Sequence, residues 1–316
     1  MSVQSEPSVP TPDSQLESAR AAEPQPKPKR SMSRTQKILF FATGWLIVLM
    51  PFLFWWSTWF GRHLSDQQIN EYLHDDKKPR HIQHALVQLG DRMRGPHNAG
   101  LDKIGLEDDP GPDAATKKWY PELIRLATYP VEEVRNTDAW VMGQDTSGAG
   151  FHDALLKMLQ DSSPMVRGNA ALSLVRFGDA TGRPQIVELL QPAQLNAPVA
   201  GRVVDADRPG TAIHQGGLIA KLAAADSRAV DIRSPIPGRI RSVSQTGANI
   251  AAGAEVAVID PSTEQVWEAL RALYLIGQPD DLPAIRPYER DLPDISNDVR
   301  QQAQETEKAI QQRNQR

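Results

Sequence analysis

The sequence predicts an α+β protein in which an α-solenoid of helical repeats is interrupted by a small inserted β-sandwich and preceded by one transmembrane helix. Three observations carry this prediction: an uncharged apolar run at residues 38–60, a helical motif that recurs at an offset of 32 residues, and a Gly-rich β motif that recurs at an offset of 37. They divide the 316 residues into five segments, 1–37, 38–60, 61–193, 194–261 and 262–316.

The composition excludes several classes of function. The formal net charge of −4 is too small to indicate a nucleic-acid-binding surface. Because the chain has no cysteine, it has no disulfide, no thiolate nucleophile, no iron–sulfur cluster and no Cys-based zinc site. We therefore expect protein partners and no nucleic acid.

The apolar run at residues 38–60 contains 23 residues without a charge. At about 1.5 Å per helical residue it spans roughly 35 Å, which exceeds a bilayer core of about 30 Å. Lys37 and Arg62 bound the run, and Trp55, Trp56 and Trp59 are placed as in an aromatic belt. A buried core helix and a cleaved signal peptide are the alternatives. The length and flanks of the run favour an uncleaved membrane anchor in contact with lipid.

The charges on either side of this run predict its orientation. Five Lys and Arg residues lie between residues 27 and 37 without an acid, whereas Asp66, Glu71, Asp75 and Asp76 follow the run. The positive-inside rule then predicts a single-pass protein of the bacterial inner membrane, with a cytoplasmic N-terminus and a periplasmic C-terminal ectodomain. The polar, Pro-rich segment 1–37 is predicted to be a disordered cytoplasmic tail.

Helical patterns resume after the run. Ser65 is placed to cap a first helix, and a second helix beginning near Pro79 has Ile82, Leu86 and Leu89 on one face. Residues 95–113 form a polar loop rich in Gly and Pro.

A helical repeat follows. Residues 120–126 (YPELIRL) align with residues 152–158 (HDALLKM), and at the same offset Val-Arg recurs at 134–135 and 166–167. Residues 161–171, which begin with Asp161 and end with Ala170-Ala171, resemble the HEAT-repeat pattern D-x-x-x-x-V-R-x-x-A-A. The earlier copy departs from this pattern, with Asp138 at the first Ala position. The resemblance implies a solenoid of stacked helix pairs. It also implies that Arg135, Arg167 and Arg300 serve packing between repeats.

The β motif at residues 194–261 is doubled. Residues 197–203 (APVAGRV) align with residues 234–240 (SPIPGRI), and Gly210, Gly216, Ile219 and Leu222 have counterparts 37 positions later. The doubled pattern resembles the biotinyl/lipoyl domain, also called the barrel-sandwich hybrid. Carriers of that family hold a modified lysine at the hairpin between the halves. Here the hairpin, residues 223–233, has no lysine, and Lys221 precedes it within a strand. The same hybrid occurs in periplasmic adaptors of efflux and secretion pumps, but those insert a long helical hairpin that this chain lacks.

The last segment, 262–316, resembles the helical repeats again. Residues 268–277 align with residues 169–178, Val299-Arg300 repeats the Val-Arg pair, and the polar end suits a capping helix. The sandwich is therefore predicted to be an insertion into the solenoid.

Candidate sites for chemistry are weak, and we predict no catalytic, cofactor-binding or metal-binding residues. His81 and His84 lie three apart on one helix and would suit a metal, although a solvated helix face is favoured. His97 and His152 are isolated, and the acidic cluster at residues 108–113 lacks the alternating ligands of a calcium loop. Gly201, Gly238, Gly247 and Gly253 are better explained by tight β turns than by phosphate binding.

The function predicted from these features is a membrane-anchored, non-catalytic periplasmic scaffold, not an enzyme and without a cofactor, that docks the protein partners of an inner-membrane complex. The alternative is an adaptor subunit of an efflux or secretion transporter, and a biotin or lipoyl carrier is a third, weaker possibility.

Overall fold

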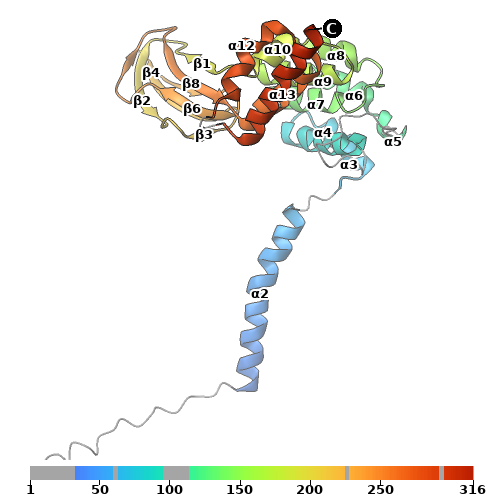
Figure 1. Cartoon of the computed structure of the whole chain (residues 1–316). Coiled ribbons are helices and arrows are strands. Elements are labelled where there is room, and N and C mark those ends of the chain that lie inside the picture. Colours follow the sequence, from blue (N-terminus) through green and yellow to red (C-terminus); the bar gives the residue numbers. More distant parts are fainter. Residues whose placement is uncertain (1–32, 60–62, 95–113, 225–227, 292–294, 316) are drawn as a thin grey trace, which may run out of the picture. The chain divides into compact units, whose positions relative to one another are not determined.

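The computed structural model describes residues 33–59, 63–94, 114–224, 228–291 and 295–315. The chain forms two units, residues 1–62 and 63–316 (Figure 1). In the first unit, helix α2 (Arg34–Trp59) contains 26 residues and begins four residues before the predicted run. Residues 34–37, which were predicted to be disordered, are therefore helical, whereas the rest of the predicted tail up to residue 32 lies outside the described residues.

The predicted membrane crossing is wrong. A crossing helix needs about 20 consecutive residues that are predominantly apolar, because it must span the bilayer core. Over the part of the chain that the structure describes, no helix combines the length and the hydropathy that such a crossing needs. This finding overturns the predicted inner-membrane localisation, the periplasmic ectodomain and the lipid contact of an anchor.

The second unit begins with the two predicted helices, α3 (Asp66–Leu73) and α4 (Pro79–Arg94). Ser65 caps α3 as predicted, because its hydroxyl accepts a hydrogen bond from the Gln68 amide while the Gln68 side chain accepts one from the Ser65 amide. Ile82 and Leu86 of α4 are fully buried. The predicted loop 95–113 lies outside the described residues.

The helical repeats follow as short first helices and longer second helices. Their bounds are α5 (Ala114–Lys117), α6 (Tyr120–Leu126), α7 (Glu132–Met142), α8 (Phe151–Met158), α9 (Pro164–Arg176) and α10 (Arg183–Glu188). The second helices α4, α7 and α9 pack against one another in series, and one apolar core runs through all of them. A single helix pair could not bury its apolar face alone, so the series of pairs supplies the core.

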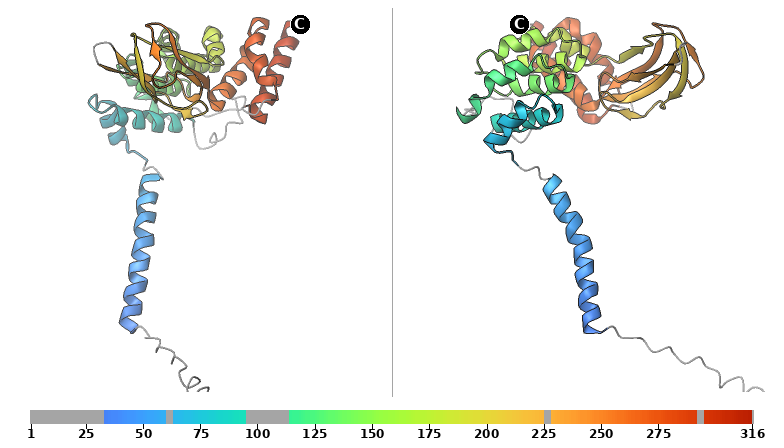
Figure 2. Two further views of the ribbon diagram at one scale, coloured as in Figure 1. Left: turned by 90° about the vertical axis from the view of Figure 1, so that its left-hand side faces the viewer. Right: turned by 180° about the vertical axis from the view of Figure 1, so that it is seen from behind.

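A β-sandwich follows α10. Its strands are β1 (Ala193–Asn196), β2 (Gly201–Ala206), β3 (Ala212–Ile213), β4 (Leu218–Ala224), β5 (Ala229–Arg233), β6 (Gly238–Val243), β7 (Asn249–Ile250) and β8 (Glu255–Pro261). They form two antiparallel sheets, ordered β1-β8-β6-β3 and β5-β4-β2-β7, which Figure 2 shows as two facing layers. Each strand has a counterpart about 37 residues away (β1 and β5, β2 and β6, β3 and β7, β4 and β8). The two members of each pair occupy the same position in the two sheets.

The doubled sequence motif produces this symmetry by burying equivalent residues. Val203 and Ile240 are both 1% exposed, and the buried residues Leu195, Ile219 and Leu222 likewise have buried counterparts 37 positions later. The glycines that open β2 and β6 are also equivalent. A Cβ on Gly201 would lie 2.6 Å from the Ala223 carbonyl oxygen, and one on Gly238 would lie 1.8 Å from that of Asp260. Close approach of the strands, rather than a turn, requires glycine at these two positions.

The chain leaves and re-enters the helical array at one place, because the first and last strands pair with Ala193 opposite Ile259. The remaining elements are α11 (Thr263–Ile276), η1 (Pro279–Asp281), α12 (Leu282–Ile285), η2 (Arg286–Glu289) and α13 (Asn297–Asn314). Helix α11 packs on α9 and α10, and α13 packs on α11. The Gln265 side-chain amide donates to the Leu189 carbonyl at 2.8 Å and holds α11 to the end of α10. The helices on both sides of the sandwich thus form one core.

Candidate functional site

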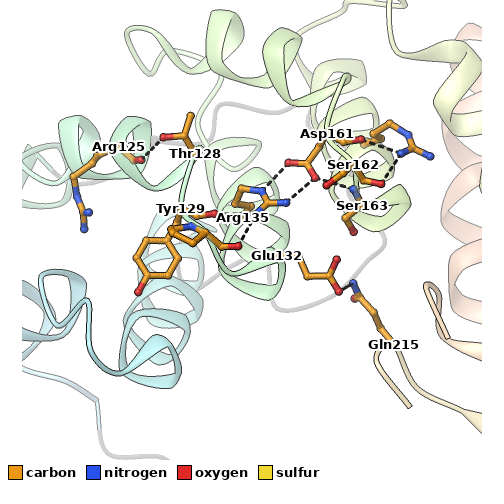
Figure 3. Close-up of polar contacts among 11 residues, drawn as sticks. Arg125, Thr128, Tyr129, Glu132, Arg135, Asp161, Ser162, Ser163 and Gln215 are labelled. Carbon is orange, nitrogen blue, oxygen red and sulfur yellow. Dashed lines mark hydrogen bonds and ion pairs between the residues drawn. The ribbon is translucent and has the colours of Figure 1, made fainter. Parts of the chain in front are cut away.

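The predicted repeat arginine Arg135 joins two successive repeats. Its Nε and Nη2 donate to the two carboxylate oxygens of Asp161 at 2.7 and 2.8 Å (Figure 3). Its Nη1 donates to the carbonyls of Tyr129 at 2.8 Å and of Pro130 at 3.2 Å, in the turn before its own helix. One guanidinium therefore fixes the turn of one repeat to the following repeat, as the HEAT resemblance implies.

Burial affects the two partners of this pair differently. Burial by itself would raise the pKa of Asp161, but hydrogen bonds from the Arg135 side chain and the Ser163 amide outweigh it and lower that pKa. The hydrogen bond to Asp161 raises the pKa of Arg135. Both side chains are nearly buried, with exposures of 12% and 10%, and the two opposite pKa shifts favour the ionised pair.

Arg167 repeats this arrangement one unit later. Its Nη1 donates to the carbonyls of Asp161 at 2.9 Å and of Ser162 at 3.1 Å, and its Nε and Nη2 bind the carboxylate of Glu188 on α10. Asp161 therefore accepts from both arginines, through its side chain and through its backbone. We call Arg135, Asp161, Arg167 and Glu188 the arginine ladder.

The ladder does not include the third predicted arginine. Arg300 binds Asp291 and donates to the Asn297 side chain at 2.8 Å, both close to it in sequence. The Asp291 side chain is 92% exposed. Arg300 therefore makes its contacts near the start of its own helix, and no contact with a described residue connects it to another repeat, which corrects the prediction for this residue.

A second set of contacts joins α7 to α9. The Asn169 side-chain amide donates to the Asn136 side-chain oxygen at 2.8 Å, and the Ser173 hydroxyl donates to the Ala139 carbonyl at 2.8 Å. A Cβ on Gly143 would lie 2.3 Å from the Ser173 hydroxyl oxygen, so glycine permits this close contact. These polar contacts fix the register of the two helices across their interface.

Asp138 is the exception within this packed array. It lies at the position where the next repeat has Ala170, and its side chain is fully buried. Neither carboxylate oxygen has a hydrogen-bond partner among the described residues. Burial raises its pKa well above the usual value, the negative charge of Glu122 adds to the effect, and Arg125 opposes it.

Two contacts between described residues join the sandwich to the second helices of the repeats. The Gln215 side-chain amide donates to the Glu132 carboxylate at the start of α7, at 3.3 Å (Figure 3). Met165, in the first turn of α9, packs against the sandwich core. Both contacts lie at the N-terminal ends of second helices, so the opposite ends of these helices are not involved.

The histidines weighed as metal ligands have other roles. The His81 ring donates a hydrogen bond from Nδ1 to the Asp75 carboxylate at 2.9 Å and stacks on Tyr72, with ring centroids 4.3 Å apart. His84 bonds instead to the Gln88 side chain at 3.0 Å. His152, expected to be isolated, pairs with Asp179 at 2.8 Å. Across the described ranges there is no group of three or more His, Asp or Glu residues arranged for a metal ion. His97 and the acidic cluster 108–113 lie outside those ranges.

Lys221, the lysine nearest the hairpin of the sandwich, lies within β4. Its neighbours on the flanking strands are Asp205 of β2 and Asp231 of β5. Strand pairing continues to Ala223 opposite Ala229, which places Lys221 two residues before the end of the paired segment. Lys221 therefore occupies a strand position flanked by acids and not the tip of a hairpin.

The comparisons with known proteins agree with the helical part. A family model described as HEAT repeat matches residues 153–180. The chain contains a HEAT repeat. No curated protein matches the chain. One matching solved structure is titled "Structure and function of a single-chain, multi-domain long-chain acyl-coa carboxylase"; it is 16% identical, with a TM-score of 0.21, and the match covers 42% of this chain and 14% of that one. A likeness with so low a TM-score supports no statement about this chain.

The matched residues 153–180 include α9 and Arg167, so they contain half of the arginine ladder. HEAT repeats are protein-interaction modules, and protein partners are expected for this chain. The sequence pattern located the arginines and also Asp161, the leading residue of the HEAT pattern, but it did not reveal that Asp161 is the acceptor for Arg135 of the preceding repeat.

Proposed function

We propose that this protein is a non-catalytic scaffold that binds protein partners on the stacked second helices of its repeats. The observation that carries the proposal is the HEAT repeat at residues 153–180, joined to the preceding repeat by the arginine ladder. The ladder ties adjacent repeats on the side of the N-terminal ends of α7 and α9. A rigid array of this kind is pre-organised, so a partner that binds it loses little ordering entropy in the array.

We further propose that the sandwich is a biotinyl/lipoyl-like domain that serves as a second docking face. The exchange of its two sheets by the 37-residue repeat supports this assignment. A carrier role is not supported, because Lys221 lies inside β4 between Asp205 and Asp231. A biotin or lipoyl carrier needs its modified lysine at an accessible hairpin tip.

The transporter-adaptor alternative has less support than the scaffold. Strands β4 and β5 pair as far as Ala223 and Ala229, and five residues join these two positions. A connection this short has no room for the helical arm that such adaptors insert between the two halves. The alternative also relied on a membrane anchor, which the structure does not support.

The test is affinity purification of the tagged full-length chain, with chemical cross-linking and mass spectrometry of the proteins that co-purify. A partner in stoichiometric amount, cross-linked to the helical repeats or to the sandwich, is the expected result. Recovery of the chain alone under gentle conditions would contradict the scaffold function. A covalent biotin or lipoyl adduct in the intact mass would contradict the proposal for the sandwich.

A further inference from the structure

A cluster of arginine and tryptophan side chains lies on the second helices α4, α7, α9 and α11. It includes the C-terminal ends of the first three helices, away from the arginine ladder and from the sandwich contacts. We call it the arginine–tryptophan face, and it consists of Arg94, Trp140, Gln144, Arg176, Trp267 and Arg271.

The first part of this face is a stacked pair between two helices. The Arg94 guanidinium at the end of α4 lies over the indole of Trp140 on α7, 5.0 Å from the ring centroid. Gly90 leaves room for the indole to pack against α4, because a Cβ at that position would lie 2.3 Å from a ring carbon of Trp140. This arrangement places the guanidinium on the indole, and among the described residues no carboxylate pairs with it.

The centre of the face is Arg176, the last residue of α9. Its Nη1 donates to the Gln144 side-chain oxygen at 2.9 Å, and Gln144 in turn donates to the Trp140 carbonyl at 2.7 Å. Burial lowers the pKa of Arg176, and the positive charges of Arg94 and Arg271 lower it further, while Glu268 opposes them. Arg176 is nevertheless exposed to solvent, so a ligand can reach it.

The third part of the face is on α11, beyond the inserted sandwich. The Arg271 guanidinium lies over the indole of Trp267, 4.5 Å from the ring centroid. Arg271 and Glu268 are the charges of α11 that act on Arg176. The charges of three arginines from three helices and of Glu268 thus act on one another, and α11 packs on α9.

The charge balance of this face differs from that of the arginine ladder. Arg135 and Arg167 each bind a carboxylate, whereas among the described residues Arg94 and Arg176 make no ion pair. The positive charge of Arg94 disfavours the charge on Arg176 in the free protein, and a ligand carboxylate that binds both would relieve this repulsion. The two indoles add the rigid apolar contact area that is enriched at the centres of protein interfaces.

We propose that the arginine–tryptophan face binds an acidic segment of a partner protein, with carboxylates on Arg94 and Arg176 and apolar side chains on the indoles. This inference rests on the proposed scaffold function. A protein segment is favoured over a nucleic acid because the chain carries a net charge of −4 and Glu268 stands within the cluster.

The test measures the fluorescence anisotropy of a labelled peptide of repeated Glu-Glu-Leu units with the purified full-length chain. The double variant Arg94→Gln and Arg176→Gln should weaken binding about tenfold or more, since it removes two charge-assisted contacts. The control variant Arg208→Gln removes an exposed sandwich arginine that makes no ion pair among the described residues, and it should bind as the wild type does. Raising the ionic strength should weaken wild-type binding and have a smaller effect on the double variant.

Equal binding by the wild type and the double variant would overturn the inference, as would equal binding of a Gln-Gln-Leu peptide. Tighter binding of an oligonucleotide with the same number of charges would overturn it in favour of a phosphate ligand. If a natural partner is recovered equally by the double variant and the wild type, the inference fails while the scaffold function stands. If neither recovers a partner, the scaffold function fails on its own.

Discussion

Replacement of the buried carboxylate Asp138 by alanine should stabilise the protein. The side chain is fully buried and neither oxygen has a hydrogen-bond partner among the described residues. A buried polar group without a partner costs about 1–3 kcal/mol, and more when it is charged. The alanine leaves a void of about one water molecule, roughly 30 Å³, which at about 24 cal/mol per Å³ costs about 0.7 kcal/mol. The balance is a gain of about 1–2 kcal/mol at pH 7, with Ala170 as the precedent in the next repeat.

The pH dependence of this gain follows from the sign of the pKa shift. The folded-state pKa of Asp138 is raised above its unfolded value, so the proton stabilises the fold at low pH. This stabilisation is lost as the pH rises through the folded-state pKa. The advantage of Asp138→Ala should therefore be small near pH 4 and grow with pH. Asp138→Asn removes the ionisation but keeps an unpartnered polar group, so it should remove the pH dependence with a smaller gain.

The assay is thermal and urea unfolding of the wild type and both variants at several pH values, followed by circular dichroism. For a unit of this size, about 1 kcal/mol corresponds to roughly 2–4 °C in Tm, so Asp138→Ala should raise Tm by roughly 2–8 °C at pH 7. A lower Tm for both variants at every pH would mean that the Asp138 carboxylate is hydrogen-bonded in the folded protein, and it would contradict the prediction.

Three other predictions concern the ladder, the sandwich and the C-terminal helices. Arg135→Gln should lower the free energy of unfolding, measured by urea titration, by about 2–3 kcal/mol, because it leaves the nearly buried Asp161 without its partner. Arg300→Gln is the control, since the partner of Arg300 is exposed, and it should change the free energy of unfolding by less than about 0.5 kcal/mol. Gly238→Ala should cost about 3 kcal/mol or more, because its Cβ would force β6 away from β8; a sandwich that is unchanged in amide exchange would contradict the strand register. Burial and then the hydrogen bond with Glu307 raise the pKa of Glu289 to about 7. The stability that this proton provides is present below pH 4.5 and is lost as the pH rises through 7. The packing of α13 should therefore loosen over that range, as measured by faster amide exchange in α13. Glu289→Gln should abolish this pH dependence.

The sequence predicted the periodic features of the fold well. The offset of 32 aligned the Val-Arg pairs of α7 and α9, and the offset of 37 paired Val203 with Ile240 in the sandwich core. Such repeats are visible because each unit must bury the same face in the same way. The insertion of the sandwich was also predicted, since the helical pattern stopped and resumed.

The sequence predicted the contacts between repeats less well, because they join residues without a common period. Asp161 lies in a turn and accepts from both arginines of the ladder, whereas Arg300 has the same local motif but no acceptor in a neighbouring repeat within the described ranges. The arginine–tryptophan face combines side chains from four helices and becomes visible only when these helices are packed. The membrane crossing was predicted from the length of an uncharged run, and the structure does not support it.

Amide hydrogen–deuterium exchange of the chain, free and in complex with its co-purified protein partner, tests the scaffold function most directly. Protection on binding should concentrate in the C-terminal halves of α4, α7 and α9 and in α11, with the turns of the arginine ladder unchanged. Protection confined to α8 and α10, or no change in any helical repeat, would contradict this prediction.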